Sequence, residues 1–314
     1  MELNALTKYQ YMKRNNFMIL ILFLFPLSVF CQVSDQQMEK MLKDELDSLS
    51  AGGKKIYRIY FNSSNEKYFL DFLKNYESSP VEMVQIRVIG LKYQIAMGSV
   101  DTLLRQRVVR EMVSLIDKGS VPISQYVVNR LVDFGDHDYS NESRKKLEEQ
   151  FLKFQKSNNF ILICGIAQVR ILIPALRSIA SKFNRKSSSW FNDPSWFAHL
   201  ALARMQAIRS IDTIIAAVEL YAGKVFKVSR LLQLVAYTKH PDAIHLLSIY
   251  LQSGDVLSIS DGGTGIPVNL YALEYLAIYI ENFPVKIKYL GYSPEDIKLG
   301  IAYMNKIDNY HILE

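Results

Sequence analysis

The chain has 314 residues, of which 37 are Lys or Arg and 31 are Asp or Glu, so its formal net charge is +6. Hydrophobic residues make up 49% of it, which suits one or two globular domains or one extended array. Basic and acidic side chains are interspersed, and this pattern provides no basic surface of the kind that nucleic-acid-binding proteins present. The composition therefore argues against a nucleic-acid partner.

The first 31 residues have the pattern of a secretory signal peptide. Lys13 and Arg14 precede an apolar run over residues 17–30, and residues 29–31 suit the positions before a cleavage site. The run is short for a membrane-spanning helix, which needs about 20 apolar residues. We therefore predict cleavage before Gln32 and no membrane span in the mature chain, with an uncleaved anchor as the alternative. Cleavage removes three basic residues and one acidic residue, so the mature charge would be +4.

The two cysteines bear on localisation. Cys31 raises the alternative of a lipid-anchored protein, but Phe30 stands where a lipoprotein has a small residue. If Cys31 leaves with the signal, Cys164 is the one remaining thiol, and its apolar neighbours indicate a core position. An exported protein without disulfides fits a bacterial periplasm. We expect a periplasmic or secreted protein.

The N-terminal part of the mature chain mixes clear and ambiguous patterns. Residues 32–50 predict an amphipathic helix that Ser34 caps and Gly52 and Gly53 end. Residues 55–61 alternate as in a strand, but a lone strand has no partner, so we expect a helix or an extended linker there. Helical spacing returns over 65–76. We interpret residues 32–79 as an N-terminal helical segment that packs on or caps the rest.

From residue 80 onward helical patterns dominate, and residue 80 is the best candidate for a domain boundary. Pro122 and Pro294 stand in predicted first turns, where a missing N–H costs nothing. Further helices are expected at 81–97, 102–117, 123–134, 143–155, 267–282 and 297–307. The whole chain is therefore expected to be all-α, with a helical domain over 80–314.

One short helical pattern occurs about three times, over 165–176, 202–215 and 234–247. Each copy has an apolar helix, a turn and a second helix led by an isoleucine: Ile173, Ile211 and Ile244, which are 38 and 33 residues apart. Two helices of this length cannot bury their apolar faces alone, so neighbouring units must stack into an α-solenoid. A polar insertion at 184–194 accounts for the longer spacing.

The repeats resemble HEAT repeats, in particular the short HEAT-like form found in phycobilisome lyases. That form has Ala-Leu-x-x-Leu-Gly, a turn with Asp-Pro, and then Ala-Ile-x-x-Leu. Residues 240–247 are similar to the turn and second helix, and Ile173-Pro174-Ala175-Leu176 matches the second helix. The middle copy departs from it, because Gln206 and Ala207 replace the usual Gly-Asp. The resemblance implies a HEAT-like superhelix of antiparallel helix pairs and specifies no function.

Three residues are candidates for binding. Trp190 lies in the polar insertion, where an aromatic side chain could anchor a partner. Asp212 and His245 are equivalent positions that begin the second helices of two repeats. Because the second helices of an α-solenoid usually line its concave face, we expect these two residues in a binding groove.

The sequence gives no catalytic or metal-binding constellation. His240 and His245 are five residues apart, whereas ligands on one helix face need spacings of three or four. Asp136-His137-Asp138 lies at a helix end, where such residues form turns. The glycine-rich loop at 261–265 lacks the Lys-Ser/Thr ending of a phosphate-binding loop and is interpreted as a turn, with a ligand-contacting loop as the alternative. We therefore expect no cofactor, no metal and no enzyme activity.

These observations predict an exported, non-enzymatic scaffold that binds a protein or peptide in the periplasm or cell envelope. One alternative is a nucleic-acid-binding HEAT-like protein, since some such proteins grip DNA with basic grooves. The other is a lyase-like protein that handles a small ligand or chromophore.

Overall fold

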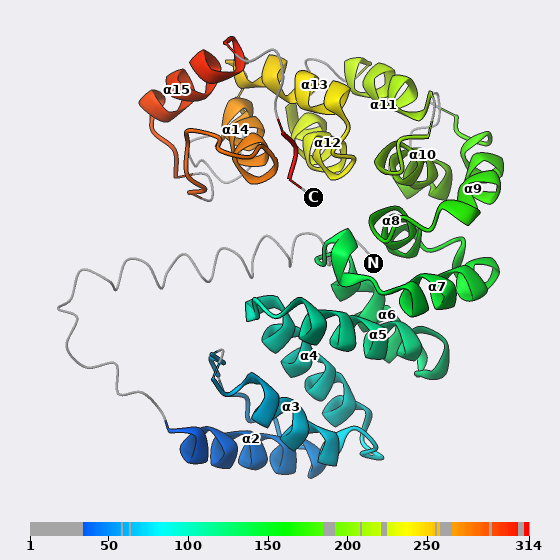
Figure 1. Ribbon diagram of the computed structural model, residues 1–314, viewed down its shortest axis with the longest axis vertical. Coiled ribbons are helices and arrows are strands. Elements are labelled where there is room, and N and C mark those ends of the chain that lie inside the picture. The colour runs from blue at the N-terminus through cyan, green and yellow to red at the C-terminus, as the bar shows by residue number, and fades with distance from the viewer. Residues whose placement is uncertain are drawn as a thin grey trace. The chain divides into compact units, whose positions relative to one another are not determined.

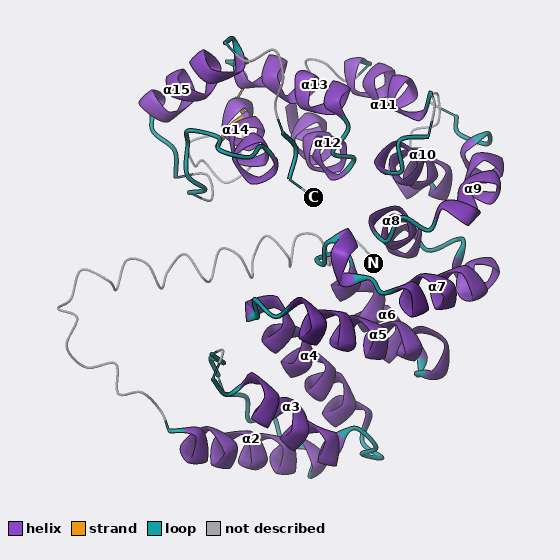
Figure 2. Cartoon of the chain, viewed as in Figure 1, coloured by secondary structure: helices purple, strands orange, loops and turns teal. Residues whose placement is uncertain are grey.

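The computed structural model describes residues 34–57, 59–62, 64–184, 192–207, 209–220, 225–254, 256–257, 266–288, 291–306 and 311–313, of which 225–230 and 256–257 are described in backbone only. The expected signal peptide, Trp190 and the loop at 261–265 lie outside these residues. Within them the fold is all-α, as Figure 2 shows.

The helices in chain order are α2 (Asp35–Ser50), α3 (Glu66–Leu73), η2 (Lys74–Tyr76), α4 (Glu82–Gly98), α5 (Thr102–Lys118), α6 (Val121–Leu131), η3 (Asp136–Asp138), α7 (Asn141–Phe154), α8 (Asn158–Ile166), η4 (Arg170–Leu172), α9 (Ile173–Ala180), α10 (Pro194–Arg204), α11 (Ser210–Glu219), α12 (Val225–Tyr237), α13 (Pro241–Leu251), α14 (Val268–Tyr279) and α15 (Pro294–Met304). Figure 1 labels the α-helices. Two short antiparallel strands, β1 (Val256–Leu257) and β2 (Ile266–Pro267), pair with each other.

The expected helices are present, with differences at their ends. α6 ends at Leu131 and not at Phe134, and α15 runs from Pro294 to Met304 and not over 297–307. Pro294 is in the first turn of α15, after Ser293, whose side chain caps the helix and accepts a hydrogen bond from the backbone N–H of Asp296. A cap of this kind starts a helix earlier than apolar spacing alone indicates.

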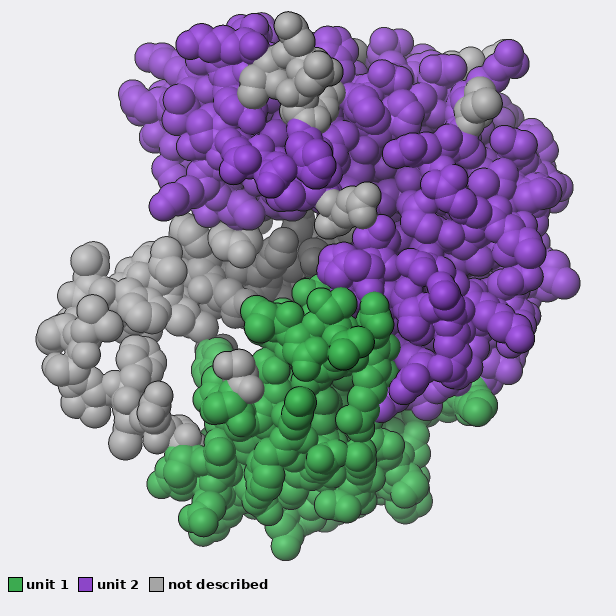
Figure 3. Space-filling view, viewed as in Figure 1, with its two compact units in different colours: residues 1–108, 118–130 green, residues 109–117, 131–314 purple. Residues whose placement is uncertain are grey.

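The chain divides by contacts into two compact units, which Figure 3 colours separately. Unit 1 comprises residues 1–108 and 118–130, and unit 2 comprises 109–117 and 131–314. This division passes through α5 and α6. The boundary at residue 80 stays a prediction, because contacts do not show which part folds independently.

Unit 1 contains α2, α3 and α4. The segment between α2 and α3 is extended, and its described residues form neither helix nor strand. Glu45 of α2 is fully buried and forms an ion pair with Arg87 of α4. The same carboxylate accepts the backbone N–H of Tyr57 at 3.0 Å, and the Arg87 guanidinium donates to the Tyr57 carbonyl at 3.2 Å. This buried pair therefore holds the extended segment against two helices.

In unit 2 two rows of helices run side by side in chain order. α10 packs against α8 and α12, and α14 packs against α12, which forms one row. In the other row α11 packs against α13, and α13 against α15. The core under the last helices gathers residues that are spread over α12, α13 and α14, among them Leu232, Leu247, Leu273 and Leu276. The apolar faces of each pair of helices in this part are thus buried against the next pair.

α8 and α10 approach each other most closely at Gly165. A Cβ on Gly165 would lie 2.8 Å from the Ala201 Cα of α10 and 2.3 Å from the Tyr237 hydroxyl. That hydroxyl donates a hydrogen bond of 2.6 Å to the Leu162 carbonyl of α8. Glycine at this position therefore lets three successive helices of one row pack together.

Candidate functional site

The first helix of each repeat ends in the same left-handed turn. Gln168, Gln206 and Lys239 follow α8, α10 and α12, and their φ angles are 54°, 57° and 48°. These residues are 38 and 33 residues apart, the same spacings as those of Ile173, Ile211 and Ile244. Each isoleucine stands five residues after the left-handed one. The equivalence proposed from the sequence is thus present in the backbone.

This turn explains where the middle copy departs from the HEAT-like pattern. Gln206 occupies the left-handed position, which glycine usually fills because it has no Cβ. Its N–H donates to the Ala203 carbonyl at 2.9 Å, and the Ala207 N–H donates to Leu202 at 2.8 Å, the two bonds of a Schellman motif. The same two bonds close the turn at Gln168. Backbone hydrogen bonds therefore hold the turn where glycine is replaced.

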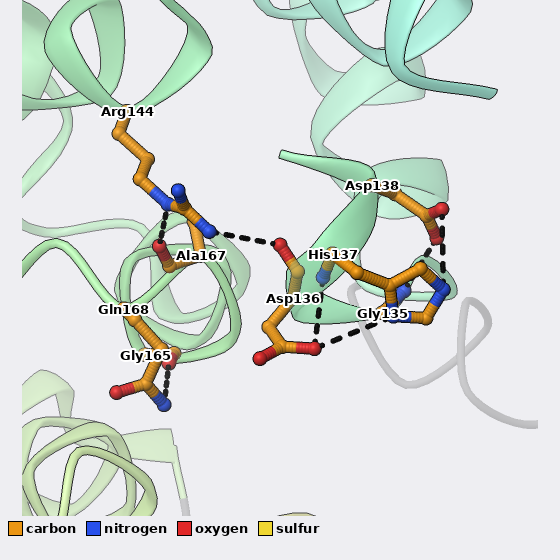
Figure 4. A network of polar contacts seen from close by, with 8 residues as sticks. All are labelled: Gly135, Asp136, His137, Asp138, Arg144, Gly165, Ala167 and Gln168. Carbon is orange, nitrogen blue, oxygen red and sulfur yellow. Dashed lines mark hydrogen bonds and ion pairs between the residues drawn. The ribbon is translucent and has the colours of Figure 1, made fainter. Parts of the chain in front are cut away.

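Polar side chains cap these turns from one helix to the next. Figure 4 shows Arg144 of α7 donating to the Ala167 carbonyl at 2.7 Å and to the Asp136 carbonyl at 3.1 Å. The Gln168 side chain donates to the Arg204 carbonyl at 3.0 Å, and Arg204 donates to the Tyr237 carbonyl at 2.9 Å. We call Arg144, Gln168 and Arg204 the capping ladder. It places cationic or amide donors against the negative C-terminal ends of three helices.

A hollow of about 440 Å³ opens between α9, α10 and α11. Ala180, Ser181, Phe183, His199, Asp212, Thr213 and Ala216 line it. This volume is within the range of small-molecule pockets, about 300–1,000 Å³. The turn after α10 determines where α11 begins. It therefore also determines the position of Asp212 and Thr213, which line the hollow from α11.

His199 is the central polar side chain of this hollow. Its ring makes a hydrogen bond to the backbone of Ala180, and burial lowers the pKa of the imidazole below 6.5. The other ring nitrogen, Nδ1, is buried and has no hydrogen-bond partner among the described residues. The Phe183 ring lies edge-on to the imidazole, with 5.5 Å between the ring centroids. His199 is therefore held neutral near pH 7, with Nδ1 able to accept a hydrogen bond.

Asp212 supplies the negative charge of the hollow. It is exposed, in the first turn of α11, and no residue in the described part of the chain forms a hydrogen bond or an ion pair with its carboxylate. The remaining lining residues are uncharged, and His199 is neutral near pH 7. The lining therefore carries one negative charge, which suits a cationic group.

Of the other two candidate residues, the structure describes only His245. Trp190 lies outside the described residues. His245 is exposed on α13 at the position equivalent to Asp212, and the hollow does not include it. Figure 1 shows α11 and α13 on the outer side of the curve that the helices of unit 2 follow, with α10 and α12 on the inner side. The expectation that the second helices line a concave face does not agree with this arrangement.

The sequence does not identify His199 as a site residue. The apolar neighbours in the helix correctly indicate burial. They do not show how the two ring nitrogens are paired. That pairing depends on the backbone of Ala180 at the end of α9, 19 residues away in the sequence.

The Asp136-His137-Asp138 segment forms a capped turn, as its place at a helix end predicts. Asp138 accepts the Gly135 N–H at 2.9 Å, and Asp136 accepts the His137 N–H at 2.8 Å (Figure 4). The His137 ring lies 3.4 Å from the Asp136 carboxylate and 3.5 Å from that of Asp138. No group of three metal-ligating side chains occurs in the described part of the chain.

Cys164 lies in α8 and is fully buried, as its apolar surroundings predict. Burial raises the pKa of its thiol well above the ordinary value, so the reactive thiolate is not populated near neutral pH. Of the helices that the structure describes, none combines the length and the apolar character that crossing a bilayer requires.

Comparisons with family models, with curated proteins and with solved structures find no match to this chain. The HEAT-like resemblance therefore depends on the motif residues alone.

Proposed function

We propose that this protein is an exported, non-enzymatic scaffold, built as a HEAT-like α-solenoid, that binds a protein or peptide partner in the periplasm or cell envelope. The observation that supports it most is the recurrence of one left-handed turn at Gln168, Gln206 and Lys239 between two rows of packed helices. Repeats that stack in this way present an extended surface, and such surfaces serve in binding.

The capping ladder supports the same proposal. In a solenoid each repeat is stabilised by its neighbours, so contacts between repeats must be strong. Arg144, Gln168 and Arg204 provide charge-assisted or amide hydrogen bonds from each helix end to the next. A row linked in this way stays rigid, and a rigid surface loses less conformational entropy on binding.

Export is tested by N-terminal sequencing and intact mass of the protein purified from its host. The proposal expects a mature chain that begins at Gln32. A mass that retains residues 12–31, or a diacylglycerol group on Cys31, would contradict it.

Partner binding is tested by photo-crosslinking in envelope extract. A photoreactive residue replaces Thr213, which lines the hollow, or Lys153, an exposed residue of α7, in otherwise identical mature chains. The proposal expects one discrete cross-linked protein from the first variant and none from the second. Equal, diffuse labelling by both variants would argue against a specific partner.

The polar insertion is tested separately through Trp190. We expect Trp190→Ala to weaken partner binding by more than about 1 kcal/mol, the threshold for an interface hot spot, with little change in melting temperature. The opposite result, a large drop in melting temperature with unchanged affinity, would assign Trp190 to packing.

A small-ligand function is the second candidate, and the hollow beside His199 is the observation that favours it. Native mass spectrometry of the protein purified without denaturation distinguishes it. A stoichiometric bound small molecule, lost in a variant with Ala216→Leu, would support this candidate over a scaffold.

A further inference from the structure

We infer that the hollow between α9, α10 and α11 binds a basic side chain, Lys or Arg, of the partner polypeptide. This inference rests on the proposed scaffold function and names the chemistry by which it recognises its partner. Three features of the described residues support it: an unpaired carboxylate, an aromatic ring and a neutral imidazole with a free acceptor.

The carboxylate is the first feature. Asp212 is exposed and has no ion-pair partner in the described part of the chain. Its equivalent in the next repeat is His245, so the acid is not a requirement of the repeat itself. Some other exposed acids of unit 2 are paired, as Glu142 is with Lys146 and Asp117 with Lys153, but Asp212 lines a hollow and has no such partner among the described residues. An unpaired carboxylate at the rim of a hollow can therefore form an ion pair with an incoming cation.

The second feature is the wall beside that carboxylate. The Phe183 ring is half-buried and lines the same hollow. Phenylalanine rings attract ammonium and guanidinium groups through their electron-rich faces. The long aliphatic stem of Lys or Arg can also cover Ala180 and Ala216, which line the hollow. Charge and shape thus favour the same ligand.

The third feature is the imidazole of His199. Because burial lowers its pKa, the ring is neutral near pH 7 and does not repel a cation. Nδ1 is closed off from water and unpaired among the described residues, which is energetically unfavourable. Nδ1 can only accept hydrogen bonds, since the ring donates its proton to the Ala180 backbone. A donor N–H that enters as the wall side chains move aside would satisfy it.

The hydroxyls of Ser181 and Thr213 complete the lining. The Ser181 hydroxyl donates to the Ser178 carbonyl at 2.9 Å, so its own oxygen remains an acceptor toward the hollow. All polar groups of the lining can therefore accept hydrogen bonds. An ammonium or guanidinium group has only donors, and it matches this set.

The test is an NMR titration of the mature full chain with N-acetyl-lysine methylamide, N-acetyl-arginine methylamide and the uncharged N-acetyl-glutamine methylamide. The His199 ring signals report binding. The inference expects saturable shifts with at least one basic probe and none with the glutamine probe. The absence of saturable shifts with both basic probes, or equal binding of the glutamine probe, would overturn it.

Two variants locate the binding. Asp212→Asn should raise the dissociation constant of the basic probe about fivefold, the effect of losing one partly exposed ion pair. The matched control is Asp242→Asn, because Asp242 is also an exposed acid in the first turn of a neighbouring second helix. The control should leave binding unchanged. Equal effects of the two variants would overturn the assignment to the hollow.

The cross-linked partner distinguishes this inference from the proposed function. If Asp212→Asn weakens both the probe and the cross-link at Thr213, the inference is supported. If the partner still cross-links to Asp212→Asn with unchanged yield, the scaffold function stands and the inference fails. Spermidine tests whether the hollow binds a free amine instead. If spermidine binds more tightly than both basic probes and does not reduce the cross-link to the partner, the hollow binds a free amine and the inference also fails.

Discussion

Unit 1 and unit 2 are both helical, but they are held together in different ways. In unit 1 an extended segment lies against α2 and α4 through a buried ion pair, Glu45 with Arg87. In unit 2 the same turn recurs, apolar helices pack row by row, and polar side chains bond carbonyls at helix ends. The extended segment of unit 1 thus depends on one buried polar contact, whereas unit 2 repeats the same kinds of contact from one helix pair to the next.

The difference has a physical reason. A backbone segment without helix or strand leaves its N–H and C=O groups unpaired, so side chains must satisfy them. Glu45 and Arg87 do this for Tyr57. Repeated helices pair almost all of their own backbone groups and need help only at their ends, which the capping ladder provides. Four predictions test this difference between the two units.

The largest effect is expected in unit 1. Glu45→Ala should lower the free energy of unfolding by about 3 kcal/mol, because it leaves the Arg87 guanidinium and the Tyr57 N–H without their buried partner. Urea denaturation of the mature chain measures it. Asp44→Ala is the control, since Asp44 is an exposed neighbour whose ion pair with Lys55 is open to solvent. Equal losses in the two variants would mean that burial of the pair does not matter.

The next effect probes the close packing of unit 2. Gly165→Ala should lower the free energy of unfolding by about 2 kcal/mol, because the new Cβ overlaps the Ala201 backbone and the Tyr237 hydroxyl. Gly98→Ala is a matched control in a helix with open space at the Cβ position. Combining Gly165→Ala with Tyr237→Phe should recover part of the loss. A neutral Gly165→Ala would show that α8 and α10 can move apart freely.

A smaller effect is expected from the capping ladder. Arg204→Met removes the donor to the Tyr237 carbonyl but keeps most of the side-chain volume, so we expect a loss of about 1–2 kcal/mol. Arg177→Met on the exposed face of α9 should cost less. Hydrogen exchange localises the change, with faster exchange expected in α10 and α12. Uniform acceleration over the whole chain would indicate global unfolding and not a local link.

The smallest effect concerns pH. The pKa of His199 is lowered in the folded protein, so the unfolded chain takes up a proton near pH 6.5 before the folded one does. Stability should therefore be full above about pH 6.5 and should decrease as the pH falls from there toward the folded-state pKa. His199→Gln should flatten this slope in urea titrations, and His245→Gln, at an exposed site, should not. Identical slopes for both variants would contradict the burial of His199.

Much of the fold could be predicted from the chain because its determinants are local. Apolar spacing, Ser34, Pro122 and the glycine pair at 52–53 place the first helices correctly, since caps and breakers act within one helical turn. The repeat positions Ile173, Ile211 and Ile244 follow from periodicity alone. These features need no knowledge of which helices meet.

Tertiary structure decided the rest. Glu45 reads as one more charge on an amphipathic helix, and only its distance to Arg87 and Tyr57 shows that it holds a segment in place. The repeat position indicates Asp212, but His199 of α10 and Phe183 in the loop after α9 join it only in the folded chain, because the sequence separates these residues. A hollow forms where side chains meet in space. Its chemistry depends on contacts that short-range patterns cannot encode, whereas helices depend on hydrogen bonds between residues four apart.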